Sequence, residues 1–314
     1  MRLFFGFTLF VSLFMMMACQ PSRPGSNSNI ALNWDASDKL IHGSTAAESS
    51  RFGLAMMIVR GEKWSTCSAT IIGRRLILTA AHCLSHLQES PARLVLWRNP
   101  LTRDASGASQ PSNADGLMEP IAEIVRHVRH PLFRDGDTQN GYDLAVGYTD
   151  RDFPADMAPV ALAPKNWLAL PILKFYFVGA GSKHPNPMMD QTAQTLQQGD
   201  VTGETTVTRA SYMGWMGDAF SHSPLNPGDR LVSATESLQR TFICKGDSGG
   251  ALVQRNDDGS SMQVGILVTT FMRKFEGQPV CYGSAMTSVP VSAHADWIQK
   301  TMLDLSNYSK AETR

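Results

Sequence analysis

Short apolar runs separated by turn residues occupy the chain from residue 41 onward, and they constrain its fold more than any other feature. Most runs are shorter than a typical helix and few repeat at helical spacing, so we expect them to form strands. Many short strands predict an all-β barrel or sandwich. The predicted strands are 52–59, 70–72, 76–79, 94–97, 121–125 and 144–148 in the first half, and 173–178, 194–201, 205–209, 251–254, 263–271 and 284–289 in the second.

Two polar segments and one helix complete this pattern. Residues 99–120 predict a long loop, and residues 150–164, which contain Pro154, Pro159 and Pro164, predict the connection between two halves. Near the end of the chain Ser292 can cap a helix. The residues that share one face of this helix at the expected spacing are His294, Trp297, Ile298, Met302 and Leu305.

Residues 1–19 have the features of an export signal. Arg2 precedes a nearly continuous apolar run that is shorter than a typical membrane-spanning helix. The run ends at Ala18-Cys19, which resembles the lipobox of bacterial lipoproteins, although Met16 stands where that motif usually has Leu. We expect a lipid on Cys19 that attaches the protein to a membrane; an ordinary cleaved signal is the alternative. The chain is then periplasmic, an outer-membrane lipoprotein, or secreted, with residues 20–40 as a linker or pro-segment.

Charge and cysteine content exclude several classes of function. The 314 residues carry 28 Lys and Arg against 28 Asp and Glu, so no basic surplus indicates a nucleic-acid partner. Setting Cys19 aside leaves an even set of cysteines, which predicts two disulfides in an exported chain, with three connectivities open. No CxxC motif or His/Cys cluster has zinc spacing, so we expect no metal and no cofactor. The four cysteines of the even set are Cys67, Cys83, Cys244 and Cys281.

A serine between glycines, in the run Gly246-Asp247-Ser248-Gly249-Gly250, is typical of a nucleophile presented on a sharp turn. His82 and Asp143 lie upstream, and the order His, Asp, Ser is one that builds a charge-oriented nucleophile. In this arrangement Ser248 attacks, His82 takes and returns the proton, and Asp143 orients the imidazole. The backbone N–H groups of Gly246 and Ser248 would stabilise an oxyanion.

Two other interpretations account for the same serine. The run also fits G-x-S-x-G, the nucleophile elbow of α/β-hydrolases, with Asp257 or Asp258 and then His294 as partners. However, only 66 residues follow Ser248, and the alternating βαβ pattern of that fold is missing upstream. The second interpretation is a catalytically silent homologue that acts as a binding module.

Further motifs accompany the three residues between positions 41 and 303. They are Ile41-His42-Gly43-Ser44, Cys67 with Thr79-Ala80-Ala81-His82-Cys83, Arg129-His130-Pro131-Leu132-Phe133, Val178-Gly179-Ala180-Gly181-Ser182, Cys244 through Gly250, and Trp297-Ile298. This set resembles the trypsin/chymotrypsin family. The resemblance implies an all-β fold of two six-stranded antiparallel β-barrels with a C-terminal helix, and an active site between the barrels.

The resemblance also implies domain boundaries and disulfide pairs. A peptidase domain is expected at 41–305, with barrels at roughly 41–150 and 165–290, followed by a tail at 306–314. The pairs would be Cys67–Cys83 and Cys244–Cys281, each stabilising the fold by about 3–4 kcal/mol in the chain-entropy model.

The implied activity is that of a serine endopeptidase, a monomer that acts on polypeptides and is made as a zymogen. A freed Ile41 would pair with Asp247, although the preceding residue is Leu40, after which a trypsin-type activator does not cut. Phe242 stands at the base of the primary pocket, where trypsin-like members carry Asp, so we expect apolar rather than basic side chains to bind there. The remaining pocket positions would be Ile243, Thr269, Thr270 and Ser284.

Overall fold

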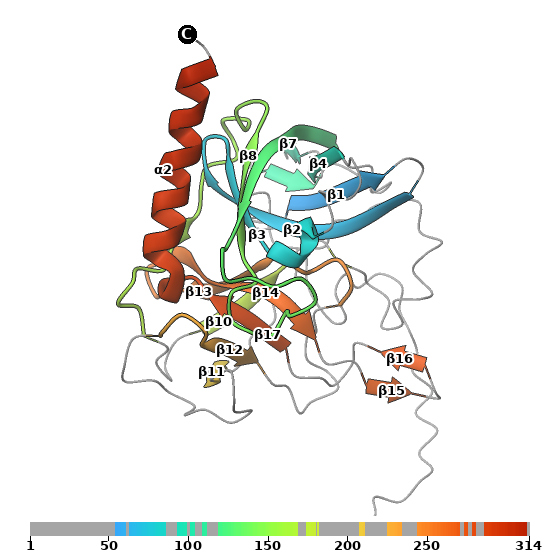
Figure 1. Cartoon of the computed structure of the whole chain (residues 1–314), viewed down its shortest axis with the longest axis vertical. Coiled ribbons are helices and arrows are strands. Elements are labelled where there is room, and N and C mark those ends of the chain that lie inside the picture. Colours follow the sequence, from blue (N-terminus) through green and yellow to red (C-terminus); the bar gives the residue numbers. More distant parts are fainter. Residues whose placement is uncertain are drawn as a thin grey trace, which may run out of the picture. The chain divides into compact units, whose positions relative to one another are not determined.

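Strands dominate the part of the chain that the structure, a computed structural model, describes (Figure 1). That part lies within the unit Ser37–Arg314. It comprises residues 54–60, 63–85, 93–98, 101–103, 109–111, 119–168, 174–179, 181, 207–210, 225–233, 244–270, 273–275, 278–280 and 286–312. The predicted strand at 194–201 and the leader at 1–19 fall outside these ranges.

Six antiparallel strands close into a barrel in the first half of the chain. Leu54, Met56 and Ile58 lie at alternate positions of one strand and are buried, so this face of the strand packs into the core. In barrel order the strands are β1 (Leu54–Arg60), β2 (Lys63–Gly73), β3 (Leu76–Thr79), β8 (Ala145–Thr149), β7 (Glu119–Arg129) and β4 (Arg93–Arg98).

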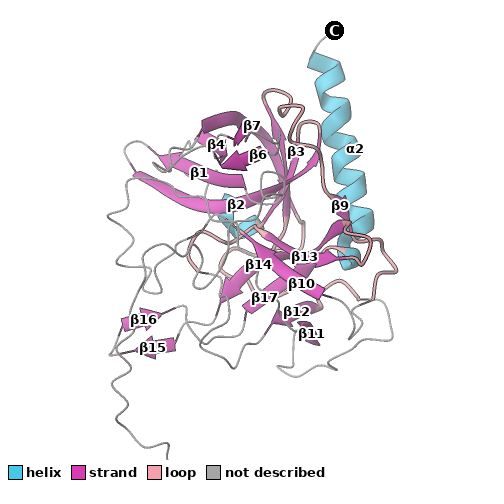
Figure 2. Cartoon of the chain, turned by 180° about the vertical axis from the view of Figure 1, so that it is seen from behind, coloured by secondary structure: helices cyan, strands magenta, loops and turns pink. Residues whose placement is uncertain are grey.

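The second half forms another antiparallel sheet (Figure 2). Its strands run in the order β10 (Lys174–Val178), β13 (Ala251–Arg255), β14 (Ser261–Thr270), β17 (Met286–Pro290), β12 (Arg230–Ser233) and β11 (Val207–Ala210). A short strand, β9 (Ala161–Leu162), pairs with β14 in parallel. Within the described ranges β10 and β11 do not pair with each other, so the described strands form an open sheet. The predicted all-β, chymotrypsin-like fold class is confirmed.

The predicted C-terminal helix is present as a 3₁₀ turn, Ser292–His294, followed by α2 (Ala295–Glu312). Ile298 and Leu305 are buried, and Trp297 and Met302 pack beside them against the core, as their spacing predicts. The helix continues through most of the segment expected as a tail. The prediction that Ser292 caps it is wrong, because Ser292 is buried and its hydroxyl has no hydrogen-bond partner among the described residues.

The connection between the halves contacts both of them. Phe153, Met157 and Val160, within the segment that its prolines predict as the connection, are buried. Val160 N–H donates to Ile71 O in β2, and Ala163 N–H donates to Gln263 O in β14. The segment therefore fastens the barrel to the second sheet, which fixes the position of the loops that meet between them.

Several short strands escape prediction from the sequence. The expected loop at 99–120 contains β5 (Leu101–Arg103) and β6 (Ser109–Pro111), and a second small hairpin joins β15 (Arg273–Phe275) to β16 (Gln278–Val280). Each has only three residues, too few to show an alternating apolar pattern. In the described part of the chain, no helix is both long and apolar enough to cross a membrane.

Candidate active site

His82 and Asp143 are brought together by the pairing of two barrel strands. His82 lies on the 3₁₀ turn Ala81–Leu84 directly after β3, and Asp143 lies just before β8. Thr79 at the end of β3 pairs with Ala145 at the start of β8. The two side chains therefore leave neighbouring strand ends, and they meet although 61 positions separate them in the chain.

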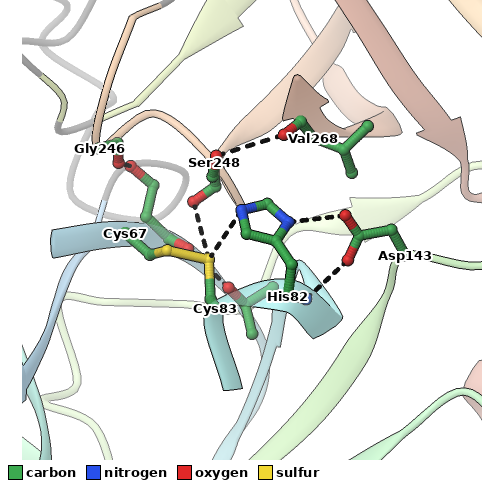
Figure 3. Close-up of a disulfide and its surroundings, with 9 residues drawn as sticks. Cys67, His82, Cys83, Asp143, Gly246, Ser248 and Val268 are labelled. Atoms are coloured by element: carbon green, nitrogen blue, oxygen red, sulfur yellow. Dashed lines mark hydrogen bonds and ion pairs between the residues drawn. A yellow bond between two sulfur atoms is a disulfide. The ribbon is translucent and has the colours of Figure 1, made fainter. Parts of the chain in front are cut away.

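The carboxylate of Asp143 makes two hydrogen bonds with His82 (Figure 3). Its Oδ2 lies 2.6 Å from Nδ1 of the imidazole, and its Oδ1 accepts the backbone N–H of His82 at 2.8 Å. Asp143 is fully buried, whereas 25% of the His82 side chain is exposed. This arrangement fixes the tautomer with hydrogen on Nδ1 and leaves Nε2 as the proton acceptor.

Ser248 lies on a tight turn between Cys244 and β13. Asp247 N–H donates to Cys244 O at 3.1 Å, and Gly250 N–H donates to Asp247 O at 2.9 Å. Gly246 and Gly249 have φ values of 99° and 86°, which favour glycine. A Cβ on Gly249 would also lie 2.2 Å from Ser68 O. The glycines of the motif are thus required by the turn and by its close contact with the barrel.

The Ser248 hydroxyl points to the second sheet in this structure. Its Oγ donates to Val268 O at 3.3 Å, and within the described residues it makes no hydrogen bond with His82. Nε2 of His82 instead lies 3.8 Å from Sγ of Cys83 (Figure 3). Catalytic hydrogen bonds are often unformed in a protein without substrate, and rotation about the Cα–Cβ bond of Ser248 is the motion that would redirect this hydroxyl.

Cys67 and Cys83 form a disulfide beside these residues, which confirms the first implied pair. Their sulfurs and the His82 ring are also a cluster of potential metal ligands. A disulfide sulfur is not a thiolate, so this cluster does not offer a cysteine ligand to a metal. Cys244 is also disulfide-bonded. Cys281, its expected partner, lies outside the described ranges.

The residues required for the α/β-hydrolase alternative do not meet. His294 is buried, its Nε2 is bonded to Gly141 O at 2.8 Å, and its ring contacts His130 and Tyr142. Asp258 is exposed and accepts hydrogen bonds from Ser260. Together with the antiparallel sheets, these positions exclude that interpretation.

Residues 41–298 match the profile of the protein family described as Trypsin. The chain belongs to the trypsin family. Three relatives are similar over much of their length, all named chymotrypsin-like elastases. Family member 1 of Macaca fascicularis is 26% identical, covering 84% of this chain and 90% of the relative. Family member 3A of Homo sapiens is 25% identical, covering 85% and 90%. Family member 1 of Felis catus is 26% identical, covering 63% and 66%.

In this trypsin-family protein Asp247, the residue directly before Ser248, is completely buried. Asp247 accepts the backbone N–H of Gly181 on Oδ1 and that of Cys244 on Oδ2, each at 2.8 Å. Gly179 and Gly181 allow this contact, because a Cβ at either position would lie within 2.6 Å of an Asp247 atom. In the described part of the chain no cationic side chain pairs with Asp247. Burial raises the pKa of Asp247 to about 7, and the two hydrogen bonds oppose that shift.

The expected primary pocket is described only at its wall. Thr269 is half-buried on β14 and pairs with Thr287, and the backbone of Thr270 pairs with Met286. The other positions expected there, Phe242, Ile243 and Ser284, lie beyond the described ranges, as does Ile41.

Sequence reasoning missed the residues that hold the serine turn in place. Ser68 N–H donates to Ser248 O at 2.7 Å, and the Ser68 hydroxyl donates to Gly246 O at 2.8 Å. Gly249 N–H donates to Leu267 O at 2.7 Å. Neither Ser68 nor Leu267 belongs to a motif of catalytic residue types, and the only available signal is that Ser68 directly follows Cys67, which is disulfide-bonded to Cys83.

Proposed function

We propose that this protein is a serine endopeptidase that hydrolyses peptide bonds through an acyl-enzyme. The supporting observation is the bonded pair of His82 and buried Asp143, located beside the turn that carries Ser248. Membership of the trypsin family agrees with this chemistry. His82, Asp143 and Ser248 are all present, so no substitution at these positions supports the alternative of a catalytically silent homologue.

The proposed reaction begins when the Ser248 hydroxyl leaves Val268 O and turns to Nε2 of His82. Oγ attacks the carbonyl carbon of the substrate, and the hydroxyl proton passes to Nε2. The resulting imidazolium is stabilised by the Asp143 carboxylate. The C–N bond breaks when His82 returns that proton to the amine, and water then releases the acyl group from Ser248 by the same route.

The developing oxyanion would be held by the backbone N–H groups of Gly246 and Ser248. Each such donor stabilises the transition state by roughly 3–4 kcal/mol. The positive φ of Gly246 and the hydrogen bonds that the Asp247 carboxylate accepts from Gly181 and Cys244 support this role, because they restrict the orientation of the peptide groups in the turn.

Activation from a zymogen is the second element of the proposal. A buried carboxylate with no cationic partner in the described residues, and with a pKa raised to about 7, would be stabilised by an ammonium group. The freed amino group of Ile41 would supply it. Sequencing the N-terminus of the active protein tests this: the proposal expects Ile41, and full activity in a chain beginning at Met1 or Cys19 contradicts it.

We also propose that small or medium apolar side chains are preferred before the cleaved bond. Phe242 offers no charge to a basic side chain, and the similar relatives are named as elastases. A peptide-library cleavage profile checks this, and dominant cutting after Arg or Lys contradicts it.

Export, with a lipid on Cys19, is proposed from the leader alone; release of Cys19→Ala from membranes would support it.

Peptide hydrolysis by the purified protein and by Ser248→Ala tests the proposed activity. We expect the substitution to lower kcat by about 10⁶-fold and to leave circular dichroism and thermal unfolding unchanged. Equal rates for the two proteins would contradict the assignment. A folded parent protein that hydrolyses no peptide would favour the silent homologue.

A further inference from the structure

Ser68 connects the barrel to the serine turn through both its backbone and its side chain. It is fully buried on β2, next to the disulfide cysteine Cys67. Its N–H donates to Ser248 O at 2.7 Å, and its hydroxyl donates to Gly246 O at 2.8 Å. One residue therefore binds two carbonyl groups of the turn, at positions two apart.

These two carbonyls lie on either side of the peptide group that carries the Ser248 N–H. Gly246 O belongs to the peptide before Asp247, and Ser248 O belongs to the peptide before Gly249. The intervening peptide joins Asp247 to Ser248, and its N–H is a proposed oxyanion donor. Because a peptide group is planar, holding the peptide on each side restricts the rotation of the one between them.

The barrel holds Ser68 itself firmly. Thr79, at the end of β3, donates its hydroxyl to Ser68 O at 2.8 Å and is fully buried. On the other side of the turn, Asp247 N–H donates to Cys244 O and Gly249 N–H donates to Leu267 O. The turn is thus held between the barrel and the second sheet, and the hydroxyl of Ser68 donates a hydrogen bond to it from the barrel side.

We propose that Ser68 is a positioning residue whose hydroxyl holds Gly246 so that the turn presents its oxyanion donors. This inference rests on the proposed endopeptidase function. Without the hydroxyl, Gly246 O loses a buried hydrogen bond, and rotation of this peptide, which glycine permits, is opposed by one contact fewer. The backbone bond from Ser68 N–H to Ser248 O would remain, so the nucleophile itself would stay in place.

The experiment compares the full-length parent protein with Ser68→Ala and with a matched control, Thr149→Val. Thr149 is also fully buried in the barrel and donates its hydroxyl to a backbone carbonyl, Arg151 O, at 2.7 Å, but it is not part of the serine turn. Two affinities are measured in each protein. One is for a peptide aldehyde, which forms a tetrahedral adduct with an oxyanion, and the other is for the corresponding peptide product, which does not. The ratio of these affinities does not depend on the folded fraction of a sample.

For Ser68→Ala we expect aldehyde affinity and kcat to fall by about 10- to 100-fold. This fall does not exceed the effect of removing one oxyanion donor completely. KM and product affinity should be nearly unchanged. Thr149→Val should keep the parent's ratio. An unchanged ratio in Ser68→Ala, or an equal fall in both variants, would overturn the inference while leaving the proposed function intact. A parent protein that neither hydrolyses peptides nor binds the aldehyde would overturn the proposed function and this inference together.

Discussion

Asp143 Oδ2 lies 2.6 Å from Nδ1 of His82, and Asp143 is fully buried while His82 reaches solvent. The pair is built by the ends of β3 and β8, so the barrel sets its geometry before any substrate binds. The Ser248 hydroxyl, in contrast, is bonded to Val268 O on the second sheet. The proposed base and its orienting carboxylate are therefore in place, and the proposed nucleophile requires a change of side-chain rotamer.

Asp143→Asn should lower kcat by about 10⁴-fold while the protein remains folded. The amide oxygen can still accept the backbone N–H of His82, but an NH₂ group beside Nδ1 favours the tautomer that places hydrogen on Nε2. That tautomer cannot take the proton of Ser248. Steady-state kinetics with a peptide anilide measures the effect, and a variant within tenfold of the parent would show that Asp143 does not orient His82.

Asp247 should make the unprocessed chain less stable as pH rises. Burial raises its pKa in the folded state from the ordinary value of 3.8 to about 7, so the folded state binds this proton more tightly. The resulting stability is complete below about pH 4 and is lost as pH rises through 7. In urea unfolding between pH 4 and 8, the unfolding free energy of the parent minus that of Asp247→Asn should decline as pH rises, because the other titrating groups contribute equally to both proteins.

The exposed Asp257→Asn serves as the control for that measurement and should keep the parent's pH profile. Processing that frees Ile41 should also remove the decline, because an ammonium beside Asp247 favours the ionised carboxyl. Identical pH profiles for parent and Asp247→Asn would contradict the account of this buried group.

His130 and His294, whose rings contact each other at the start of α2, should destabilise the protein in acid. Burial lowers the pKa of His130 and of His294 to about 4, and His130 adds to the shift at His294. Both favour the neutral form in the folded state, so their contribution is present above about pH 6.5 and is lost as pH falls toward 4. His294→Gln keeps a donor for Gly141 O without titrating in this range. The unfolding free energy of the parent minus that of His294→Gln should fall as pH falls from 6.5 to 4, and a constant difference would be a contrary result.

The disulfide beside His82 should contribute substantially to stability. Cys67 and Cys83 are 16 positions apart, and closing a loop of this size stabilises a fold by about 3 kcal/mol in the chain-entropy model. The double variant Cys67→Ala/Cys83→Ala should show this loss in urea unfolding without reductant. A loss under about 1 kcal/mol would mean that the unfolded chain gains little freedom when the bond is removed.

The fold class and the three proposed active-site residues could be predicted from the sequence because both depend on local patterns. Strands such as β3 and β8 are long enough to show buried runs, and the glycines around Ser248 are required by the turn itself. The structure brings His82 and Asp143 together as their order suggests.

The contacts that position the turn could not be predicted, because they depend on pairing between distant segments. Ser68 and Gly246 are 178 positions apart, and nothing in either local sequence indicates that a hydroxyl meets a carbonyl there. Ser292 illustrates the reverse error: a residue type that often caps helices is buried instead, with no hydrogen-bond partner in the described ranges. Local preference is overridden in both cases by the packing of the whole fold.

Reaction with a fluorophosphonate, followed by mapping of the modified peptide by mass spectrometry, tests the central claim most directly. The account predicts one adduct, on Ser248, that is absent in Ser248→Ala and forms far more slowly in His82→Ala, because the nucleophile and its base act as a unit. A folded, processed protein that remains unmodified, or that carries the adduct on another residue while Ser248→Ala is still labelled, would contradict it.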